Sequence, residues 1–131
     1  MNTLNYLTLE EVLKFHDEMI DRFGGPAGVR DLSLLESALA QPEMAVFDNE
    51  VYKTIIEKAA AYIYFVIKNH PFIDGNKRTG LVCAIVFLKN NNIEVQENFE
   101  SLYNFAIEVA ASKIEFQEII QYLNKHSVKH D

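Results

Sequence analysis

The chain has 131 residues, a formal net charge of −7, a pI near 5.0 and 49% hydrophobic residues. This length and hydrophobic content suit one globular domain, so we expect a single compact domain over residues 1–131. The acidic charge argues against direct nucleic-acid binding, because nucleic-acid-binding proteins usually present a basic surface to phosphates.

The apolar runs and the cysteine content bear on where the protein functions. Every apolar run is shorter than the roughly 20 residues that a membrane-spanning helix needs, and the N-terminal residues do not resemble a signal peptide. The single cysteine, Cys83, excludes an intramolecular disulfide and lies in the stretch LVCAIVFL, where we expect a buried hydrophobic side chain. We therefore expect a cytoplasmic protein without membrane contact.

Capping and breaking residues delimit the first helix. Thr8 and Glu11 form a capping-box pattern, and the apolar positions that follow keep helical spacing. The pattern predicts a helix over residues 8–22. Gly24-Gly25-Pro26 ends it, because the glycines allow left-handed backbone and the proline lacks an amide hydrogen.

A shorter helix and an irregular segment come next. A second capping box predicts a helix over residues 33–40 with Asp31 or Ser33 as its cap. Arg30, just before it, is expected to pair with an acid and to have a structural role. Residues 43–50 show weak periodicity, so we interpret them as a flap or short hairpin.

Two long helices are apolar around most of their circumference and should lie at the centre of the domain. The first is predicted from Asn49 or Glu50 to residue 69. The second is predicted from Lys77 to about residue 88, closed by asparagines at 90–92 that tolerate left-handed backbone.

The last third of the chain continues the helical pattern. Residues 93–96 alternate and predict a short extended piece, and a helix capped by residue 97 or 98 should run to about residue 111. A third capping box at residues 112–115 predicts a last helix to about residue 125, and the tail at 127–131 is expected to fray. The fold class is therefore all-α, with about six helices and a short hairpin before the central helix.

A polar loop separates the two central helices at residues 69–80, NHPFIDGNKRTG. It leads into the start of a helix, where free backbone amides and the positive end of the helix dipole favour an anion. Gly75 lets the backbone approach a ligand closely. Phosphate is the anion that we expect at this position.

Side chains of this loop suggest phosphoryl-transfer chemistry. Asp74 offers a hard oxygen ligand for Mg²⁺ held between one carboxylate and substrate phosphates. Lys77 and Arg78 can neutralise charge that develops on a transferring phosphoryl group. His70 suits the acceptance of a hydroxyl proton at neutral pH, and Phe72 is predicted to anchor the loop in the core.

Each of these residues also has an ordinary explanation when taken singly. A histidine before proline is common in loops, Asp-Gly pairs form turns, and Lys-Arg pairs lie on solvated helix surfaces. Their grouping on one loop between two buried helices favours a functional site. The other histidines weigh less: His16 is expected to be packed or at the surface, and His126 and His130 lie near the tail. No cluster has the spacing of a structural zinc site.

The string HPFIDGNKR resembles the signature of the Fic/Doc family. The Fic branch of that family has HPFx(D/E)GNGRxxR, and the Doc branch, the death-on-curing toxins, has HxFxDxNKR. The upstream segment GGPAGVRD-LSLLESALAQP is also similar to Doc-like proteins. The resemblance covers nearly the whole chain and implies the Fic fold.

Two positions favour the Doc branch. Lys77 stands where nucleotidyl-transferring Fic enzymes have a second glycine. Leu81 stands where they have a second arginine, which is understood to hold the γ-phosphate of ATP. Doc-like enzymes share the lysine. The resemblance implies that they bind the nucleotide in reverse and transfer its γ-phosphate to a threonine of the elongation factor that delivers aminoacyl-tRNA, which stops translation.

The resemblance also implies a role for each matching residue and for the cofactors ATP and Mg²⁺. The roles are general base for His70, Mg²⁺ ligand for Asp74, phosphate cradle for Gly75 and Asn76, and charge clamps for Lys77 and Arg78. Residues 43–49 match the region that aligns the target by strand-like pairing. An antitoxin whose C-terminal segment covers a groove beside the active site is the implied partner.

Two other functions stay open. The first is Fic-type nucleotidyl transfer, or AMPylation, onto a protein hydroxyl with Lys77 tolerated in place of glycine. The second is a catalytically silent module that binds a peptide in the same groove. The combination of His70, Asp74, Asn76, Lys77 and Arg78 argues against the silent module.

Overall fold

The computed structural model describes residues 4–131, and the first three residues of the predicted domain lie outside the described residues. Within the described part the α-helices are α1 (Leu9–Phe23), α2 (Leu32–Ala40), α3 (Ile55–Asn69), α4 (Asn76–Asn90), α5 (Phe99–Ala110) and α6 (Phe116–Lys125). A 3-10 turn (Gln41–Glu43) follows α2. Two small antiparallel sheets pair β1 (Ala45–Val46) with β2 (Asn49–Glu50) and β3 (Ile93–Val95) with β4 (Ser127–Lys129). The predicted mostly helical fold is confirmed.

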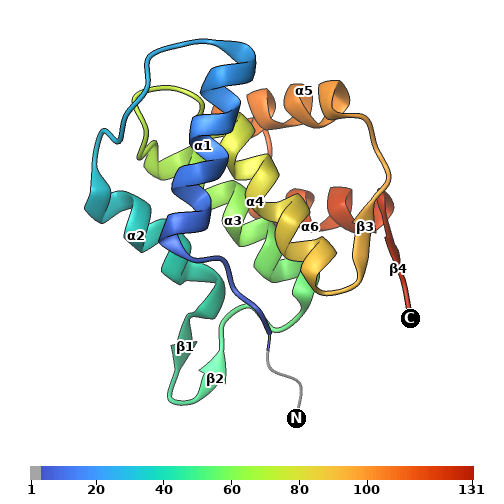
Figure 1. Ribbon diagram of the computed structural model, residues 1–131. Helices are drawn as coiled ribbons and strands as arrows, with labels where there is room; N and C mark the ends of the chain where they lie inside the picture. Colours follow the sequence, from blue (N-terminus) through green and yellow to red (C-terminus); the bar gives the residue numbers. More distant parts are fainter. Residues whose placement is uncertain (1–3) are drawn as a thin grey trace.

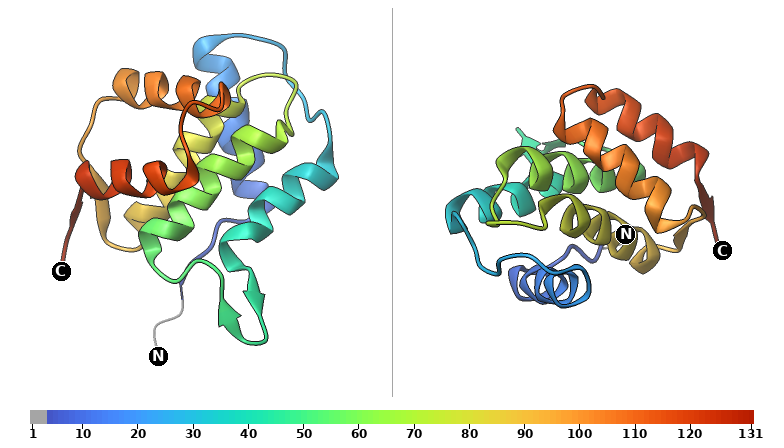
Figure 2. Two further views of the ribbon diagram at one scale, coloured as in Figure 1. Left: turned by 180° about the vertical axis from the view of Figure 1, so that it is seen from behind. Right: turned by 90° about the horizontal axis from the view of Figure 1, so that it is seen from above.

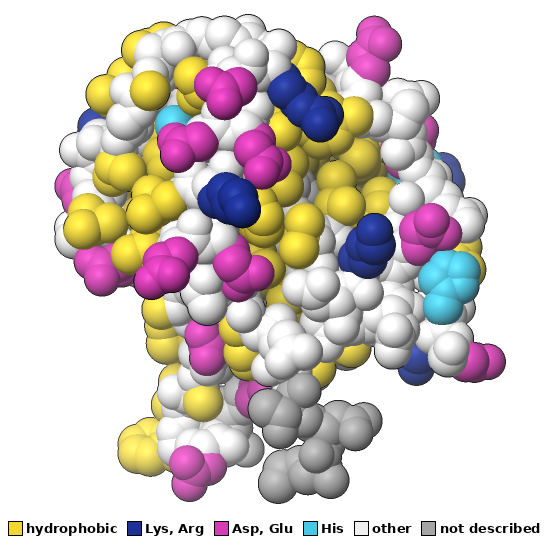
Figure 3. Space-filling model, in the orientation of Figure 1, with side chains coloured by type: hydrophobic (Ala, Val, Ile, Leu, Met, Phe, Trp, Pro, Cys, Tyr) yellow, Lys and Arg dark blue, Asp and Glu magenta, His cyan; other side chains and the backbone are white. Residues whose placement is uncertain are grey.

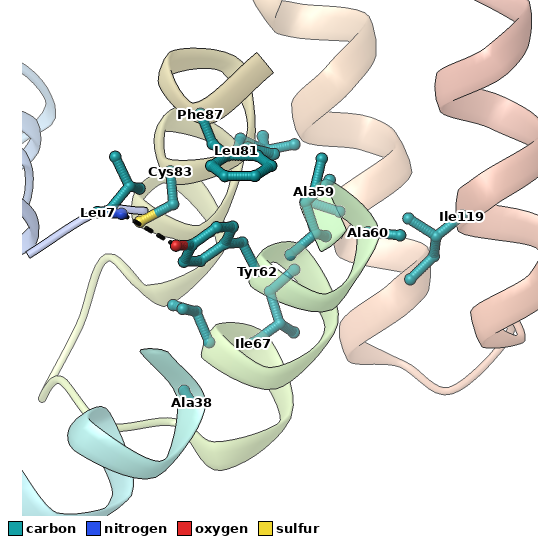
Figure 4. Close-up of a cluster of buried hydrophobic side chains, with 14 of the residues drawn as sticks. Leu7, Ala38, Ala59, Ala60, Tyr62, Ile67, Leu81, Cys83, Phe87 and Ile119 are labelled. Atoms are coloured by element: carbon teal, nitrogen blue, oxygen red, sulfur yellow. Dashed lines mark hydrogen bonds between the residues drawn. The ribbon is translucent and has the colours of Figure 1, made fainter. Parts of the chain in front are cut away.

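The helices are arranged in layers around α3 and α4. These two helices pack along each other in the middle, with α1 on one side and α5 and α6 on the other, as the view from above shows (Figure 2). Their apolar side chains form the core, in which Tyr62 and Phe87 lie next to each other (Figure 4). The buried hydroxyl of Tyr62 accepts a hydrogen bond from the Leu7 amide at 3.0 Å, which fixes the segment before α1 to the core. The prediction that α3 and α4 are central is confirmed.

Local capping explains where the first two helices begin. The Thr8 side chain accepts from the Glu11 amide, and the Glu11 carboxylate accepts from the Thr8 amide, so the predicted capping box is present. Asp31 caps α2 by accepting from the Leu34 amide at 3.1 Å. Hydrogen bonds from Ser33 and from that amide lower the pKa of the Asp31 carboxyl.

The central helix begins later than its pattern predicts. Thr54 caps α3, and its side chain accepts from the Glu57 amide at 3.0 Å. The predicted start at Asn49 or Glu50 is wrong, because both residues form β2 and pair with β1 in a hairpin. The hairpin itself was predicted over residues 43–50 and is confirmed.

Two predictions near the C-terminus are also wrong. The last capping box is formed by Glu115 and Glu118 rather than by residues 112–115, because Ser112 has a φ of 61° and belongs to the turn after α5. The tail is ordered rather than frayed. Val128 pairs with Glu94 in the β3–β4 sheet, and this pairing satisfies the backbone groups of the tail.

Helix α3 separates the hairpin from the polar loop. In Figure 1 the β1–β2 hairpin projects from one end of the molecule, and the loop between α3 and α4 lies at the opposite end. Residues 43–51 are all exposed. None of the helices in residues 4–131 is long and apolar enough to cross a membrane.

A buried lysine fastens the base of the hairpin to α3. Lys58 is 1% exposed, and its Nζ donates to Glu50 Oε1 at 2.9 Å and to the Pro42 carbonyl at 3.1 Å. Burial lowers the pKa of Lys58, but its interactions with Glu50 and Tyr6 outweigh this effect and leave the pKa above its ordinary value.

Candidate active site

The loop after α3 begins with a histidine in a left-handed conformation. His70 has φ 50° and ψ 54°, and its side chain is exposed. Arg30 stabilises this turn from the α1–α2 connection: its Nε donates to the His70 carbonyl at 2.7 Å, and its Nη2 donates to the Asn69 carbonyl at 3.0 Å. The structural role predicted for Arg30 is confirmed, although its guanidinium contacts two carbonyls where we expected an acid.

The α1–α2 connection also pairs with the loop along its backbone. The amides of Arg30 and Asp31 donate to the Pro71 carbonyl at 2.7 and 3.0 Å, and the Ile73 amide donates to the Gly28 carbonyl at 3.1 Å. The result is a short β-bridge beside the candidate site. Residues 24–31 therefore form the strand-like border of the loop.

The segment that lies next to the loop is not the one that the sequence predicts. Residues 43–49 were expected to lie beside the site, but their hairpin is at the other end of α3, a 15-residue helix that is about 22 Å long. Residues 24–31 occupy the expected place instead. At Gly25 the approach is so close that a Cβ would overlap the Asp74 carboxylate, and the φ of 107° also favours glycine.

The loop is closed on itself by Asn76. The Phe72 amide donates to Asn76 Oδ1 at 2.9 Å, and Asn76 Nδ2 donates back to the Phe72 carbonyl at 3.0 Å. The Phe72 ring is fully buried, so its predicted role as a core anchor is confirmed. Because the buried Asn76 side chain is engaged inside the loop, the part that a phosphate can reach is its backbone amide.

His16 contacts the loop from α1. It is 2% exposed, its Nε2 lies 2.7 Å from the Asp74 carbonyl oxygen, and its ring stacks on Phe72 with centroids 3.8 Å apart. A packed or surface position is predicted for His16 from the sequence, and the packed alternative is confirmed. Its contact with the loop was missed. The spacing of Val12, His16 and Met19 on one face of α1 is the signal that places this imidazole toward the core.

The start of α4 leaves its first amides available. Gly75 is the N-cap with φ 81°, and no side chain caps the helix. The Asp74 Oδ1 accepts from the Gly75 amide at 2.8 Å, and the carboxylate is otherwise exposed. Among residues 4–131 it forms no ion pair, and no group of three His, Cys, Asp or Glu side chains could hold a metal. One free carboxylate fits a Mg²⁺ ion that takes its other ligands from substrate phosphates and water.

Arg78 is held between two aromatic rings. Its guanidinium carbon lies 4.1 Å from the ring centroid of Phe23 and 4.1 Å from that of Tyr103. These cation–π contacts position the guanidinium and use no N–H hydrogen bond, so its N–H groups can bind an anion. The buried Nε has no hydrogen-bond partner among the described residues. The sequence does not predict that Phe23 or Tyr103 contacts Arg78, because α1 and α5 are remote from the motif in the chain.

A small hollow is lined by most of the residues predicted to form the site and by one of these two rings. Tyr103 lines it together with residues 74–78, which include Lys77 and Arg78. The exposed His70 lies at the other end of the same loop. Leu81, one turn after Arg78, is 1% exposed and points into the core. The position at which Fic nucleotidyl transferases have their second arginine is therefore not part of the hollow.

The fold and the loop define a mostly helical domain that carries the sequence HPFIDGNKR between its two central helices. Residues 6–88 match the model of the Fic/DOC family, which is more than half of the chain, so the protein belongs to the Fic/DOC family.

Two relatives of known name are similar to the chain. The toxin Doc of Mycolicibacterium smegmatis is 38% identical over 78 residues, a match that spans 60% of this chain and 60% of that protein, less than two thirds of its length. The protein kinase doc of Escherichia phage P1 is 28% identical over 122 residues, which spans 93% of this chain and 95% of that protein. The similarity to Doc proteins supports the Doc-like branch.

Proposed function

We propose that this protein is a Doc-like kinase that transfers the γ-phosphate of ATP to a Thr or Ser hydroxyl of a translation elongation factor, and so blocks protein synthesis as the toxin of a toxin–antitoxin pair. The observation that carries the proposal is an uncapped helix start that combines an exposed histidine, a free carboxylate and an arginine held by two rings. The printed name of the phage relative, a protein kinase, agrees with it.

The roles of the side chains follow from their positions. His70 accepts the proton of the target hydroxyl while the hydroxyl oxygen attacks the γ-phosphorus and ADP leaves. The backbone amides of the first turn of α4, from Asn76 onward, bind phosphate oxygens, Gly75 lets the backbone approach them closely, and Lys77 and Arg78 balance the charge of the transferring group. Asp74 would hold Mg²⁺, which neutralises phosphate charge when bound.

Two features favour γ-phosphate transfer over nucleotidyl transfer. Lys77 lines the hollow where Fic enzymes have a glycine, and it adds a cation. Leu81 is buried, so no second guanidinium reaches the hollow from that turn of α4. The nucleotide is therefore expected to lie with its γ-phosphate toward His70.

The target segment is expected to bind beside residues 24–31. This segment is exposed from Gly24 to Arg30, and it already pairs with the loop through one of its edges. An extended target peptide could add to the other edge by β-augmentation, which would bring its hydroxyl near His70. The β1–β2 hairpin is not proposed for this role because it lies at the other end of α3.

An apolar groove next to the site is the proposed binding surface for an antitoxin segment. Residues of α1, α4 and α5 line this groove, and hydrophobic side chains are exposed on the surface between these helices (Figure 3). The lining residues are Met19, Arg22, Phe23, Val82, Ile85 and Phe99. Phe23 also contacts Arg78, so the groove adjoins the phosphate hollow. The net charge of −7 favours a basic partner.

The decisive experiment compares ATP labelled at the γ- and α-phosphates in reactions with purified elongation factor. We expect label on the factor from γ-labelled ATP alone, and a mass increase of one phosphate. Transfer from α-labelled ATP, with the mass of a whole nucleotide, would replace the kinase by an AMP transferase. If growth inhibition were equal in wild type and His70→Ala and no label were transferred, the silent peptide-binding module would be correct.

The ring contacts of Arg78 provide a test of its role. Replacing Tyr103 by Leu removes one of the two ring contacts, and we expect kcat/KM for ATP to fall about 5- to 30-fold, since a partly desolvated cation–π contact contributes about 1 to 2 kcal/mol. Tyr103→Phe keeps the ring and should behave as wild type. Equal kinetics in Tyr103→Leu and wild type would show that the clamp does not position the guanidinium.

A further inference from the structure

His16 is a buried imidazole on α1 that contacts the backbone of the loop that carries the proposed metal ligand. The residue lies 58 positions before Asp74 in the chain, yet its Nε2 is 2.7 Å from the Asp74 carbonyl oxygen. Because a carbonyl oxygen only accepts hydrogen bonds, Nε2 carries the proton. None of the roles proposed above for the motif residues uses this side chain.

The imidazole is also fixed by its neighbours. Its ring stacks on Phe72 with an angle of 6° between the planes, and Phe72 is itself tied to Asn76 by two hydrogen bonds. A Cβ at Gly75 would lie 3.4 Å from His16 Cδ2 and Nε2, so the ring packs against the backbone of the helix cap as well. The ring therefore contacts the loop at Phe72, Asp74 and Gly75.

We propose that His16 is a positioning residue: it holds the Asp74 peptide so that the carboxylate and the first amides of α4 are arranged to bind a Mg²⁺–phosphate group. The proposal rests on the function proposed above. His16 donates to the backbone carbonyl of Asp74. In the Asp74 side chain, Oδ1 accepts from the Gly75 amide and Oδ2 lies against Gly25. Without the imidazole, the carbonyl would lose its partner, and the peptide would be free to rotate.

A purely structural role predicts a different result. If the His16 ring serves only to pack α1 against the loop and α4, its loss would lower the stability of the fold without a specific effect on metal binding. As a positioning residue, it affects the apparent affinity for Mg²⁺ more than the KM for the protein target. Residues that orient a metal ligand typically change metal affinity or activity by about 10- to 100-fold when replaced.

Two variants separate the ring from its hydrogen bond. His16→Phe keeps an aromatic ring on Phe72 but has no donor for the Asp74 carbonyl. His16→Gln loses the ring but offers an amide N–H of similar reach. His126→Phe is the matched control, because His126 also lies against an aromatic ring, Tyr122, and near a carboxylate, Glu97. It belongs to the turn after α6, away from the loop.

The first measurement is the Mg²⁺ dependence of γ-phosphate transfer. In His16→Phe we expect the Mg²⁺ concentration at half-maximal rate to rise about 10-fold or more, with the KM for the protein target unchanged. His16→Gln should return it to near the wild-type value, and His126→Phe should not change it. The proposal is overturned if His16→Phe has the wild-type Mg²⁺ dependence, or if both His16 variants are impaired only in proportion to their loss of stability.

The second measurement does not depend on catalysis. In ¹⁵N-labelled wild-type protein, NMR should show the His16 proton on Nε2. The Gly75 and Asn76 amide resonances should move in His16→Phe and stay near their wild-type positions in His16→Gln. An Nε2 without a proton, or unchanged Gly75 and Asn76 resonances in His16→Phe, would overturn the inference even if one variant failed to fold. If wild type neither binds Mg²⁺–ATP nor transfers phosphate, the proposed function fails, while these resonances still decide the role of His16.

Discussion

Helix α3 has a different kind of surface feature at each end. At its C-terminal end the carbonyls of Asn69, His70, Pro71, Phe72 and Asp74 each accept a hydrogen bond from a side chain or backbone group that lies elsewhere in the fold or across the loop. At its N-terminal end the β1–β2 hairpin is exposed throughout, and one lysine side chain ties its base to the helix.

The difference shows which of the two features needs the complete tertiary structure. The loop is held by Arg30 and His16, which come from α1 and the connection after it, so its geometry depends on how α1 packs on α4. The hairpin is formed by neighbours in sequence, with Ala45 opposite Glu50. We therefore expect changes at the loop to alter activity, and changes at the hairpin to alter only stability.

The largest expected effect is the loss of the proposed base. In His70→Asn we expect γ-phosphate transfer to fall by about 10² to 10⁴-fold, the usual contribution of a general base. Asparagine tolerates the left-handed backbone of His70 and keeps the loop intact. The unfolding free energy in urea should stay within about 0.5 kcal/mol of wild type, because the side chain is exposed. Undiminished transfer would assign the base to another group.

The next effect concerns the bonds that close the loop. Asn76→Ala leaves the buried amide and carbonyl of Phe72 without partners, so we expect the unfolding free energy to fall by about 2 to 4 kcal/mol. Asn91→Ala is the control at the other end of α4. It removes one hydrogen bond, to the Phe87 carbonyl at 2.8 Å, and should cost about 1 kcal/mol. Equal losses in the two variants would contradict the importance of the closed loop.

At the hairpin the largest effect is expected from Lys58. Lys58→Met removes its two hydrogen bonds, but Glu50 is 51% exposed and remains solvated, so we expect a loss of about 1 to 2 kcal/mol at neutral pH and unchanged transfer activity. Lys53→Met, at an exposed position before α3, is the control. A loss of activity in Lys58→Met alone would show that the hairpin acts on the site.

The pH dependence of this loss follows from the pKa of Lys58. That pKa is raised above its ordinary value of 10.5. The lysine therefore contributes its full stability below that pH, and the contribution disappears as the pH rises through the folded-state value. The difference in unfolding free energy between wild type and Lys58→Met should be constant at neutral pH and narrow only in strongly alkaline solution.

The smallest effect is expected at the tip of the hairpin. Phe47 is 93% exposed and has a φ of 50°, and Asp48 follows with a φ of 65°. A left-handed backbone is unfavourable for a bulky residue and well tolerated by asparagine. Phe47→Asn should stabilise the protein by about 0.5 to 1 kcal/mol, whereas Phe47→Leu should not. Chemical denaturation of both variants checks this, and destabilisation by asparagine would point to a packing role for the phenyl ring.

Local signals were sufficient for much of the fold. The capping box at Thr8, the Gly-Gly-Pro break and the apolar character of α3 and α4 predicted the helices within a few residues, because each signal acts through neighbours in the chain. The predictions failed where strand pairing competes with the local pattern, within a hairpin in one case and with a distant strand in the other. Asn49 and Glu50 joined a strand instead of a helix, and the tail paired with β3 instead of fraying.

The sequence by itself determined the motif loop, its position before a helix start, and the Lys77 and Leu81 substitutions that favour the Doc branch. These features are local, so their residues are adjacent in the chain. Only the tertiary structure decided which groups border the loop: residues 24–31 instead of the hairpin, His16 against the Asp74 carbonyl, and the rings of Phe23 and Tyr103 against Arg78. Such contacts join residues tens of positions apart, and they form when α1 and α5 pack against α4, which no local pattern specifies.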